Sequence, residues 1–188
     1  MTEYIRAPID TRPQDLASLS DTTIRFQKWM EQASRLINTI LTSYYGGINV
    51  KFTSEGGLAV RMINKTGSAS VQGEVLAVSD TTDNGVDLIA VDVPDPLGVF
   101  YESGIADGSY AWVVVSGIAD VYFVGNTTRG NIARGFLTAD GGSYVAGQAL
   151  SEAYPTAPFA SDKHFYEIGH VLESITGPGL AKCILHFN

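Results

Sequence analysis

The chain has one cysteine, Cys183, among its 188 residues. A single thiol cannot form an intrachain disulfide, so a disulfide-stapled fold is excluded. Cys183 lies in the largely apolar run 180–185, where we expect it to be a buried small hydrophobic side chain.

Long apolar runs are also lacking. No stretch approaches the roughly 18 consecutive apolar residues that a membrane-spanning helix needs, and residues 1–6 lack the apolar centre of an export signal. We therefore expect no membrane contact and assembly in the host cytoplasm.

Cations are few: 12 Lys and Arg stand against 20 Asp and Glu, a net charge of −8. A nucleic-acid-binding surface needs cations to neutralise phosphates, so this balance argues against one. Eight of the cations lie in the first 65 residues. Arg6 and Arg12 in that basic end are candidate contacts with an acidic partner, although solvated helix faces would explain the same charges.

Charged residues are only 17% of the chain, which favours a subunit whose surface is partly covered by neighbours.

Helical periodicity is confined to one segment. Its apolar seam has the spacing 4, 3, 4, 3 and 4 that keeps side chains on one helix face, and consists of Phe26, Met30, Ala33, Ile37, Ile40 and Tyr44. Gly46-Gly47 follows as a typical helix end. The pattern predicts an extended arm over 1–12 and an N-terminal amphipathic helix within 13–47.

Three partners could cover this seam: the chain's own β-rich domain, a parallel bundle of symmetry-related helices, or a foreign protein. Ile37 and Ile40 at successive seam positions lean toward three or more strands. The six seam residues are therefore the candidate interface of a homo-oligomer, with a trimer favoured.

Beyond residue 48 the pattern changes to short apolar runs separated by turn residues, which predicts a mainly β domain over 48–188. Asp83-Asn84-Gly85 is a strong hairpin signal, and 117–120 reads as a further turn. The regular turn spacing favours a small β-barrel or sandwich. The expected strands are 48–52, 58–63, 73–78, 86–91, 98–101, 110–116, 121–124, 132–137, 167–174 and 181–187.

The segment 139–163 reads as a long loop, with glycines, prolines and three aromatic residues. A loop of this length in a compact domain is often a contact site, so Tyr144, Tyr154 and Phe159 are candidate partner contacts. An irregular wrap across the domain would explain the same composition.

Catalytic motifs are weak. His164, Glu167 and His170, with Glu173 and His186 as further candidates, resemble a metal-binding cluster by composition. The two histidines are six apart with a glycine between them, whereas a zincin helix places them four apart. No nucleophile elbow or phosphate-binding loop is present. A carboxylate-rich stretch lacks calcium-loop spacing and reads as solvated turn acids: Asp80, Asp83, Asp87, Asp92 and Asp95. We therefore predict no catalytic, cofactor-binding or metal site, and no enzyme.

Several runs in residues 59–188 resemble a group of tailed-bacteriophage virion proteins similar to capsid decoration, or cement, proteins. They are Val60-Arg-Met-Ile-Asn-Lys-Thr66, Gly98-Val-Phe-Tyr-Glu102, Asp107-Gly-Ser-Tyr-Ala-Trp-Val-Val-Val-Ser-Gly-Ile-Ala-Asp-Val121, Glu167-Ile-Gly-His170 and Ala181-Lys-Cys-Ile-Leu-His-Phe-Asn188. The Ala-Trp-Val-Val-Val-Ser-Gly-Ile-Ala-Asp run and the C-terminal Cys-Ile-Leu-His-Phe-Asn are the most specific. The N-terminal helix lies outside the match.

This resemblance implies a small β-barrel on the outer surface of a phage head, commonly a trimer, that bridges subunits of the major capsid protein and stabilises the shell without chemistry. The alternative is a phage tail or fibre component that contacts the host surface.

Overall fold

The computed structural model describes residues 28–30, 32–33, 49–141, 144–153 and 163–186. The chain divides into two compact units, Met1–Ile48 and Asn49–Asn188. In the first unit the described residues are helical, with Met30 49% exposed and Ala33 partly buried. The arm over 1–12, most of the predicted helix over 13–47 and four seam residues lie outside the described residues. The N-terminal helix and its interface therefore stay predictions.

The second unit is built from strands, so the prediction of a mainly β chain is confirmed. Two short 3₁₀ helices, Thr138–Asp140 and Lys163–Tyr166, accompany them. The ten strands are β1 (Val50–Phe52), β2 (Gly57–Asn64), β3 (Val75–Val78), β4 (Gly85–Leu88), β5 (Gly98–Phe100), β6 (Tyr110–Phe123), β7 (Ile132–Arg134), β8 (Leu150–Glu152), β9 (Glu167–Val171) and β10 (Gly179–Leu185).

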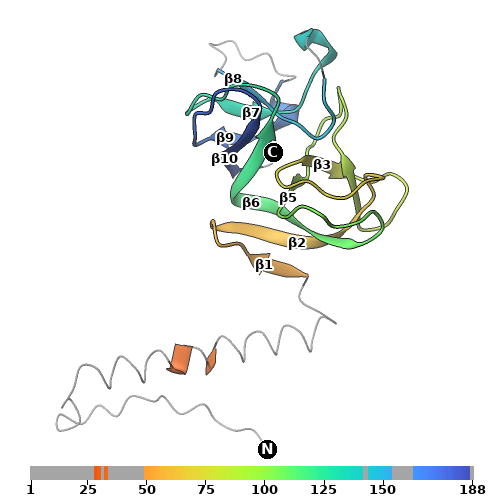
Figure 1. The fold of residues 1–188 in the computed structure, drawn as a ribbon, viewed down its shortest axis with the longest axis vertical. Helices are drawn as coiled ribbons and strands as arrows, with labels where there is room; N and C mark the ends of the chain where they lie inside the picture. The colour runs from red at the N-terminus through yellow and green to blue at the C-terminus, as the bar shows by residue number, and fades with distance from the viewer. Residues whose placement is uncertain (1–27, 31, 34–48, 142–143, 154–162, 187–188) are drawn as a thin grey trace, which may run out of the picture. The chain divides into compact units, whose positions relative to one another are not determined.

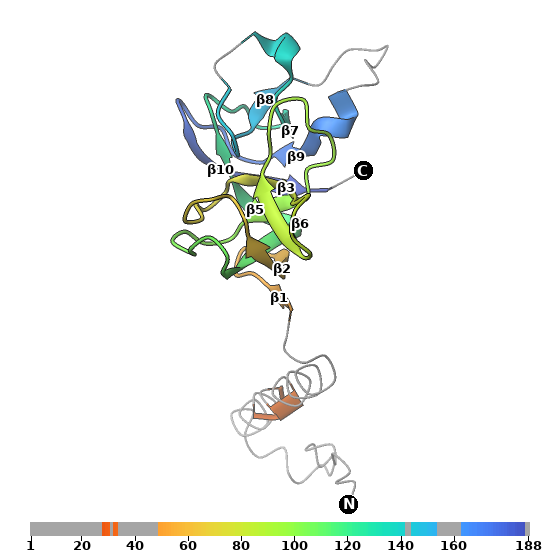
Figure 2. The same cartoon turned by 90° about the vertical axis from the view of Figure 1, so that its right-hand side faces the viewer.

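All ten strands belong to one sheet in the order β1-β2-β4-β3-β5-β6-β10-β9-β7-β8. An additional pairing joins β2 to β6, so the pairings β2–β4–β3–β5–β6 return to β2 and form a closed circuit. On the far side β6 pairs with β10, and an isolated bridge from Phe123 to Ala149 brings the residue before β8 back to the end of β6. Figures 1 and 2 show β6 running from the β2 side of this unit to the β9–β10 side.

The core follows the alternation of side chains along the strands. Alternate positions of the first circuit form one buried cluster, to which every strand contributes: Leu76, Val86, Phe100, Ala111 and Val113, with Val60 and Met62 partly buried against it. A larger cluster joins Ala59, Val75, Val99 and Val114 of the first circuit to side chains of the second half of β6 and of β9 and β10, which include Val121, Phe123, Ile168, Val171, Cys183 and Leu185. Cys183 is fully buried, as its apolar neighbours predict.

The sequence-based strand boundaries differ from the structure at two places. The turn predicted at 117–120 is wrong, because β6 continues through it. Gly117 has a φ of +82°, and a Cβ there would lie 2.5 Å from the carbonyl oxygen of Gly56. This glycine lets β6 bend where its partners change, since Gly117 is opposite Gly57 on β2 and Leu185 on β10. The loop predicted over 139–163 also contains a strand, β8.

The hairpin signal at residues 83–85 is confirmed, since β3 and β4 pair antiparallel across it and Asn84 has a φ of +57°. Among the described residues, no helix has the length and apolar character to cross a membrane.

Candidate functional site

The first candidate site is an exposed apolar edge of the sheet. Strand β1 pairs with β2, and no other described strand pairs with it. Alternation places Val50 and Phe52 on one side of β1, and they are 47% and 83% exposed. Tyr110 is 55% exposed and is opposite Ile63 on β2. Val50 and Phe52 share the face of Val60, whereas Arg61 and Tyr110 lie on the opposite face of the sheet. We call Val50, Phe52, Arg61 and Tyr110 together the β1 edge surface.

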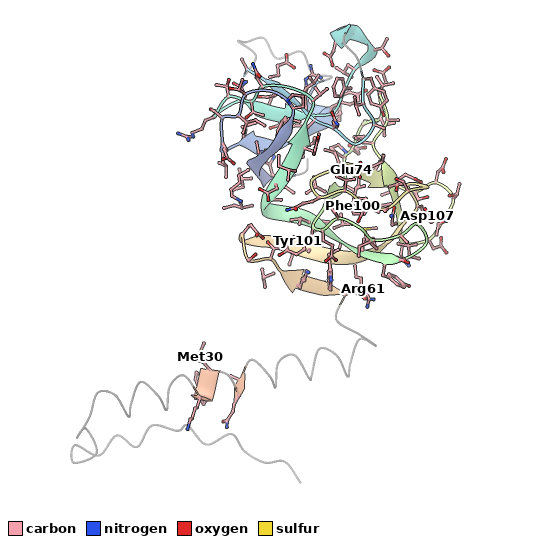
Figure 3. The ribbon with its side chains drawn as sticks, viewed as in Figure 1. Met30, Arg61, Glu74, Phe100, Tyr101 and Asp107 are labelled. Atoms are coloured by element: carbon pink, nitrogen blue, oxygen red, sulfur yellow. The ribbon has the colours of Figure 1, made fainter. Side chains whose placement is uncertain are left out.

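Cation–aromatic contacts hold this edge in place. The Lys51 ammonium points to the other side of β1 and lies 4.3 Å from the ring centroid of Tyr101 and 4.5 Å from that of Trp112. The Arg61 guanidinium lies 4.9 Å from the centroid of Tyr110. Such contacts each contribute about 0.5–1 kcal/mol at exposed positions. Arg61 and Tyr101 are labelled in Figure 3, beside β1 and β2.

An open groove runs along the same edge. Its lining combines apolar side chains with a guanidinium and two amides, and consists of Asn49, Val50, Val60, Arg61, Met62, Asn84 and Tyr110. The unpaired side of an edge strand offers backbone donors and acceptors to a further chain. The arrangement therefore fits binding of a protein surface or an extended segment.

The loop segment predicted as a contact region is anchored to the domain at two points. Arg134 is buried, with a side chain 4% exposed, and donates to Asp140 through two nitrogens at 2.6 and 2.8 Å and to Glu152 through Nε. Burial alone would lower the pKa of Arg134, but the hydrogen bonds that it donates to Asp140 and Glu152 raise this pKa overall. These pairs fasten residues 138–140 and β8 to β7.

Tyr144 is the second anchor. Its hydroxyl donates to the carbonyl oxygen of Ile89 at 2.8 Å, and its ring meets Phe136 edge-on at 5.6 Å between centroids. Tyr144 is 36% exposed, and its role as a partner contact stays a prediction. The other candidate partner contacts lie outside the described residues: Arg6, Arg12, Tyr154 and Phe159.

The second candidate site is a cluster of Glu167, His170 and His186. One donor atom of each lies within 4.8 Å of those of the other two. Glu167 Oε1 lies 3.9 Å from His170 Nε2 and 3.4 Å from His186 Nε2, and the imidazole centroids are 4.6 Å apart. Spacing along the sequence gave no reason for His170 and His186 to share a face, yet the structure brings these two side chains together. The His164 side chain lies outside the described part of the chain.

Sequence reasoning did not predict that Val50 and Phe52 are exposed on an edge strand. Their strand was expected, and alternation puts both on one side. That β1 would be an edge strand depends on its partners, which short apolar runs do not specify. Among the residues that the structure describes, the aspartates of 80–95 do not form a comparable ligand group; Asp92 instead accepts hydrogen bonds from Thr138.

No protein-family model and no curated protein sequence matches the chain. Among solved structures, the N base of the head fiber gp8.5 in bacteriophage phi29 is similar, with a TM-score of 0.47 and 13% sequence identity. The match covers 68% of this chain and 92% of that chain.

Proposed function

We propose that this chain is a structural protein of a tailed-bacteriophage virion. In this proposal it decorates the outer surface of the head as a homotrimer and stabilises the shell by bridging subunits of the major capsid protein, without catalysing a reaction. In this proposal the closed circuit β2–β4–β3–β5–β6 corresponds to the small β-barrel that the resemblance implies.

The observation that carries the proposal concerns the sequence runs that resemble capsid decoration proteins. The most specific run lies in β6, and the first three residues of the C-terminal run, Cys183 to Leu185, lie in β10. These two strands are directly paired, with Cys183 opposite Ala119 and Ala181 opposite Val121. The two most specific runs therefore contribute neighbouring strands whose buried side chains belong to the larger core cluster. This supports the interpretation that the resemblance extends from the sequence to the folded domain.

The β1 edge surface supports self-association through its place in the chain. Val50 follows Gly47, the end of the predicted bundle helix, by three residues, which span at most about 11 Å. A parallel bundle of these helices would hold the β1 strands of its copies close to one axis. Phe52, at 83% exposed, is then an apolar contact that neighbouring copies can cover.

Light scattering on the purified chain tests the trimer. We expect a species of three times 20.1 kDa. Ile37→Asp and Ile40→Asp should each reduce it to monomer, because an unpaired carboxylate buried in the seam costs several kcal/mol. Gln32→Asp introduces the same charge off the seam and should leave the trimer intact. A wild-type monomer, or seam variants that assemble normally, would contradict the proposed bundle.

Virion labelling tests the location. Antibody against the chain, coupled to gold, should label the heads of the phage that encodes it, and the purified chain should cosediment with expanded capsids. Label confined to the tail tip would instead support the tail or fibre role.

A further inference from the structure

The cluster of Glu167, His170 and His186 is assembled by two neighbouring strands. β9 and β10 are antiparallel, with His170 opposite Ile184. His186 follows β10, and its backbone N–H donates to the carbonyl oxygen of Ile168 at 3.2 Å. Alternation places His186 on the same face as Ile184, which is the face of His170. The two imidazoles thus meet across the strand pair.

A bulge in β9 turns Glu167 to this face. Along β7 a single step from Ala133 to Arg134 corresponds to two residues of β9, from Gly169 to Glu167. An extra residue of this kind reverses the alternation beyond it. Without it, residues three apart such as Glu167 and His170 would lie on opposite faces. Burial follows the same shift, since Ile168 and Val171, also three apart, both lie in the core.

Gly169 makes the bulge feasible. Its φ is +155°, and a Cβ there would lie 2.0 Å from the carbonyl oxygen of Ile184, a backbone atom of the adjacent strand. Only a residue without a side chain fits so close to the neighbouring strand. Gly169, which lies between Glu167 and His170 in the sequence, is therefore the residue that allows the bulge to bring these two side chains to one face.

The geometry of the donors suits one small ion. Ligand atoms about 2.0–2.2 Å from a tetrahedral metal lie roughly 3.3–3.6 Å from one another. The two carboxylate–imidazole distances of 3.4 and 3.9 Å are near this range. His186 Nε2 is a buried atom, although the side chain as a whole is 40% exposed, so this nitrogen is turned toward Glu167 Oε1. Small rotamer changes would bring the three donor atoms to the separations that one ion requires.

The donor types select a class of metal. Two imidazole nitrogens and a carboxylate suit Zn²⁺ and its first-row neighbours, whereas Mg²⁺ and Ca²⁺ prefer all-oxygen sites. The carboxylate side chain is 3% exposed, and the histidines are 34% and 40% exposed on the outer side. A metal held here has three protein ligands and keeps a fourth coordination position for a ligand from outside the protein.

We propose that Glu167, His170 and His186 form a binding site for one Zn²⁺ ion per chain, with a fourth coordination position left for a ligand from outside the protein. The site is independent of the proposed virion role, since its donors lie on β9 and after β10 and the β1 edge surface lies on other strands.

Calorimetric titration of the untagged full chain, freed of metal by a chelator, tests the site with Zn²⁺ alone. We expect one Zn²⁺ bound per chain and no binding of Mg²⁺. With free Zn²⁺ at about 100 times the Kd, the melting temperature should rise by about 5–10 °C. If the wild-type chain binds no Zn²⁺, the proposal is wrong.

Variants assign the ligands. His170→Ala and His186→Ala should each weaken Zn²⁺ binding by more than about 10-fold, the loss that even outer-shell changes can produce. Ile184→Ala is the matched control, because this residue lies opposite His170 on the same face and offers no ligand atom. His186→Gln, which replaces the imidazole by an amide of similar size, checks the result if the alanine variant is poorly folded by circular dichroism. Unchanged Zn²⁺ affinity in a folded His170→Ala, His186→Gln double variant would overturn the assignment.

Discussion

Replacing Gly169 by alanine tests the structural logic of the β9 bulge. A Cβ at this position would lie 2.0 Å from the carbonyl oxygen of Ile184 and 2.9 Å from both the carbonyl carbon of Ile184 and the Cα of Leu185. All three are backbone atoms of β10, so no side-chain rotation relieves the overlap. Either β9 separates from β10 or the bulge is lost.

The expected cost has two parts. A non-glycine residue held at this φ costs about 1–3 kcal/mol, and each backbone hydrogen bond lost as the strands separate costs about 0.5–1.5 kcal/mol. Together these predict a loss of about 3–5 kcal/mol in the free energy of unfolding. For a chain of this size that lowers the melting temperature by about 10 °C or more. Urea unfolding followed by tryptophan fluorescence measures the free energy, and circular dichroism measures the melting temperature.

Gly177→Ala is the matched control in the loop between the same two strands. Its φ is +81°, but nothing lies within 4 Å of a Cβ placed there. This variant should lose only about 1 kcal/mol, from backbone strain alone. If the two variants lose the same free energy within error, the close approach at Gly169 does not restrict the residue, and the account of the bulge is wrong.

Three further predictions concern buried polar groups. Arg134→Met should lower the free energy of unfolding by about 3 kcal/mol in urea titrations, because it leaves the carboxylates of Asp140 and Glu152 without their buried cation; a loss below about 1 kcal/mol would contradict this. Burial raises the pKa of Cys183 to about 12, so at about pH 8 only roughly one thiol in ten thousand is ionised. A thiol reagent should label the denatured chain and leave the folded chain unlabelled. Rapid labelling of the folded chain would contradict the burial of Cys183. Burial also raises the pKa of Glu74, so the folded state favours the protonated carboxyl. The contribution of Glu74 to stability is therefore greatest at low pH and falls as the pH rises through the folded-state pKa. Glu74→Gln should gain stability relative to wild type as the pH rises from about 4 to 7, and a constant difference across that range would count against this.

Much of the β-rich unit was predictable from local patterns. Period-two runs and turn residues located nine of the ten strands, and Asn84 marked the β3–β4 turn because its backbone tolerates a positive φ. The exception, β8, is a three-residue strand in a segment rich in glycine and proline. Its pairing with β7 is a tertiary contact and leaves little periodic signal in so short a run.

The strand partners could not be predicted in the same way. Gly117 looked like a turn residue, and only the close approach of Gly56 shows that it bends a continuous strand. The Glu167, His170 and His186 cluster depends on a bulge and on a neighbouring strand 15 or more residues away, so its ligands are adjacent in space without a recognisable spacing in sequence. Phe52 is exposed because β1 lies at the edge, which also follows from topology alone.

The shared strand β6 has a consequence for the way the unit opens and forms. The circuit β2–β4–β3–β5–β6 forms one half of the unit and β10, β9, β7 and β8 form the other, and β6 pairs with β2 over residues 110–117 and with β10 over residues 117–123. Because one continuous strand joins the two halves, we infer that backbone amides on β2 and β10 exchange with solvent through the same cooperative opening. Both halves also depend on contacts between distant parts of the chain, which slows folding. Since β10 lies between β6 and β9, the second half cannot be completed during synthesis until residues 179–185 have emerged from the ribosome.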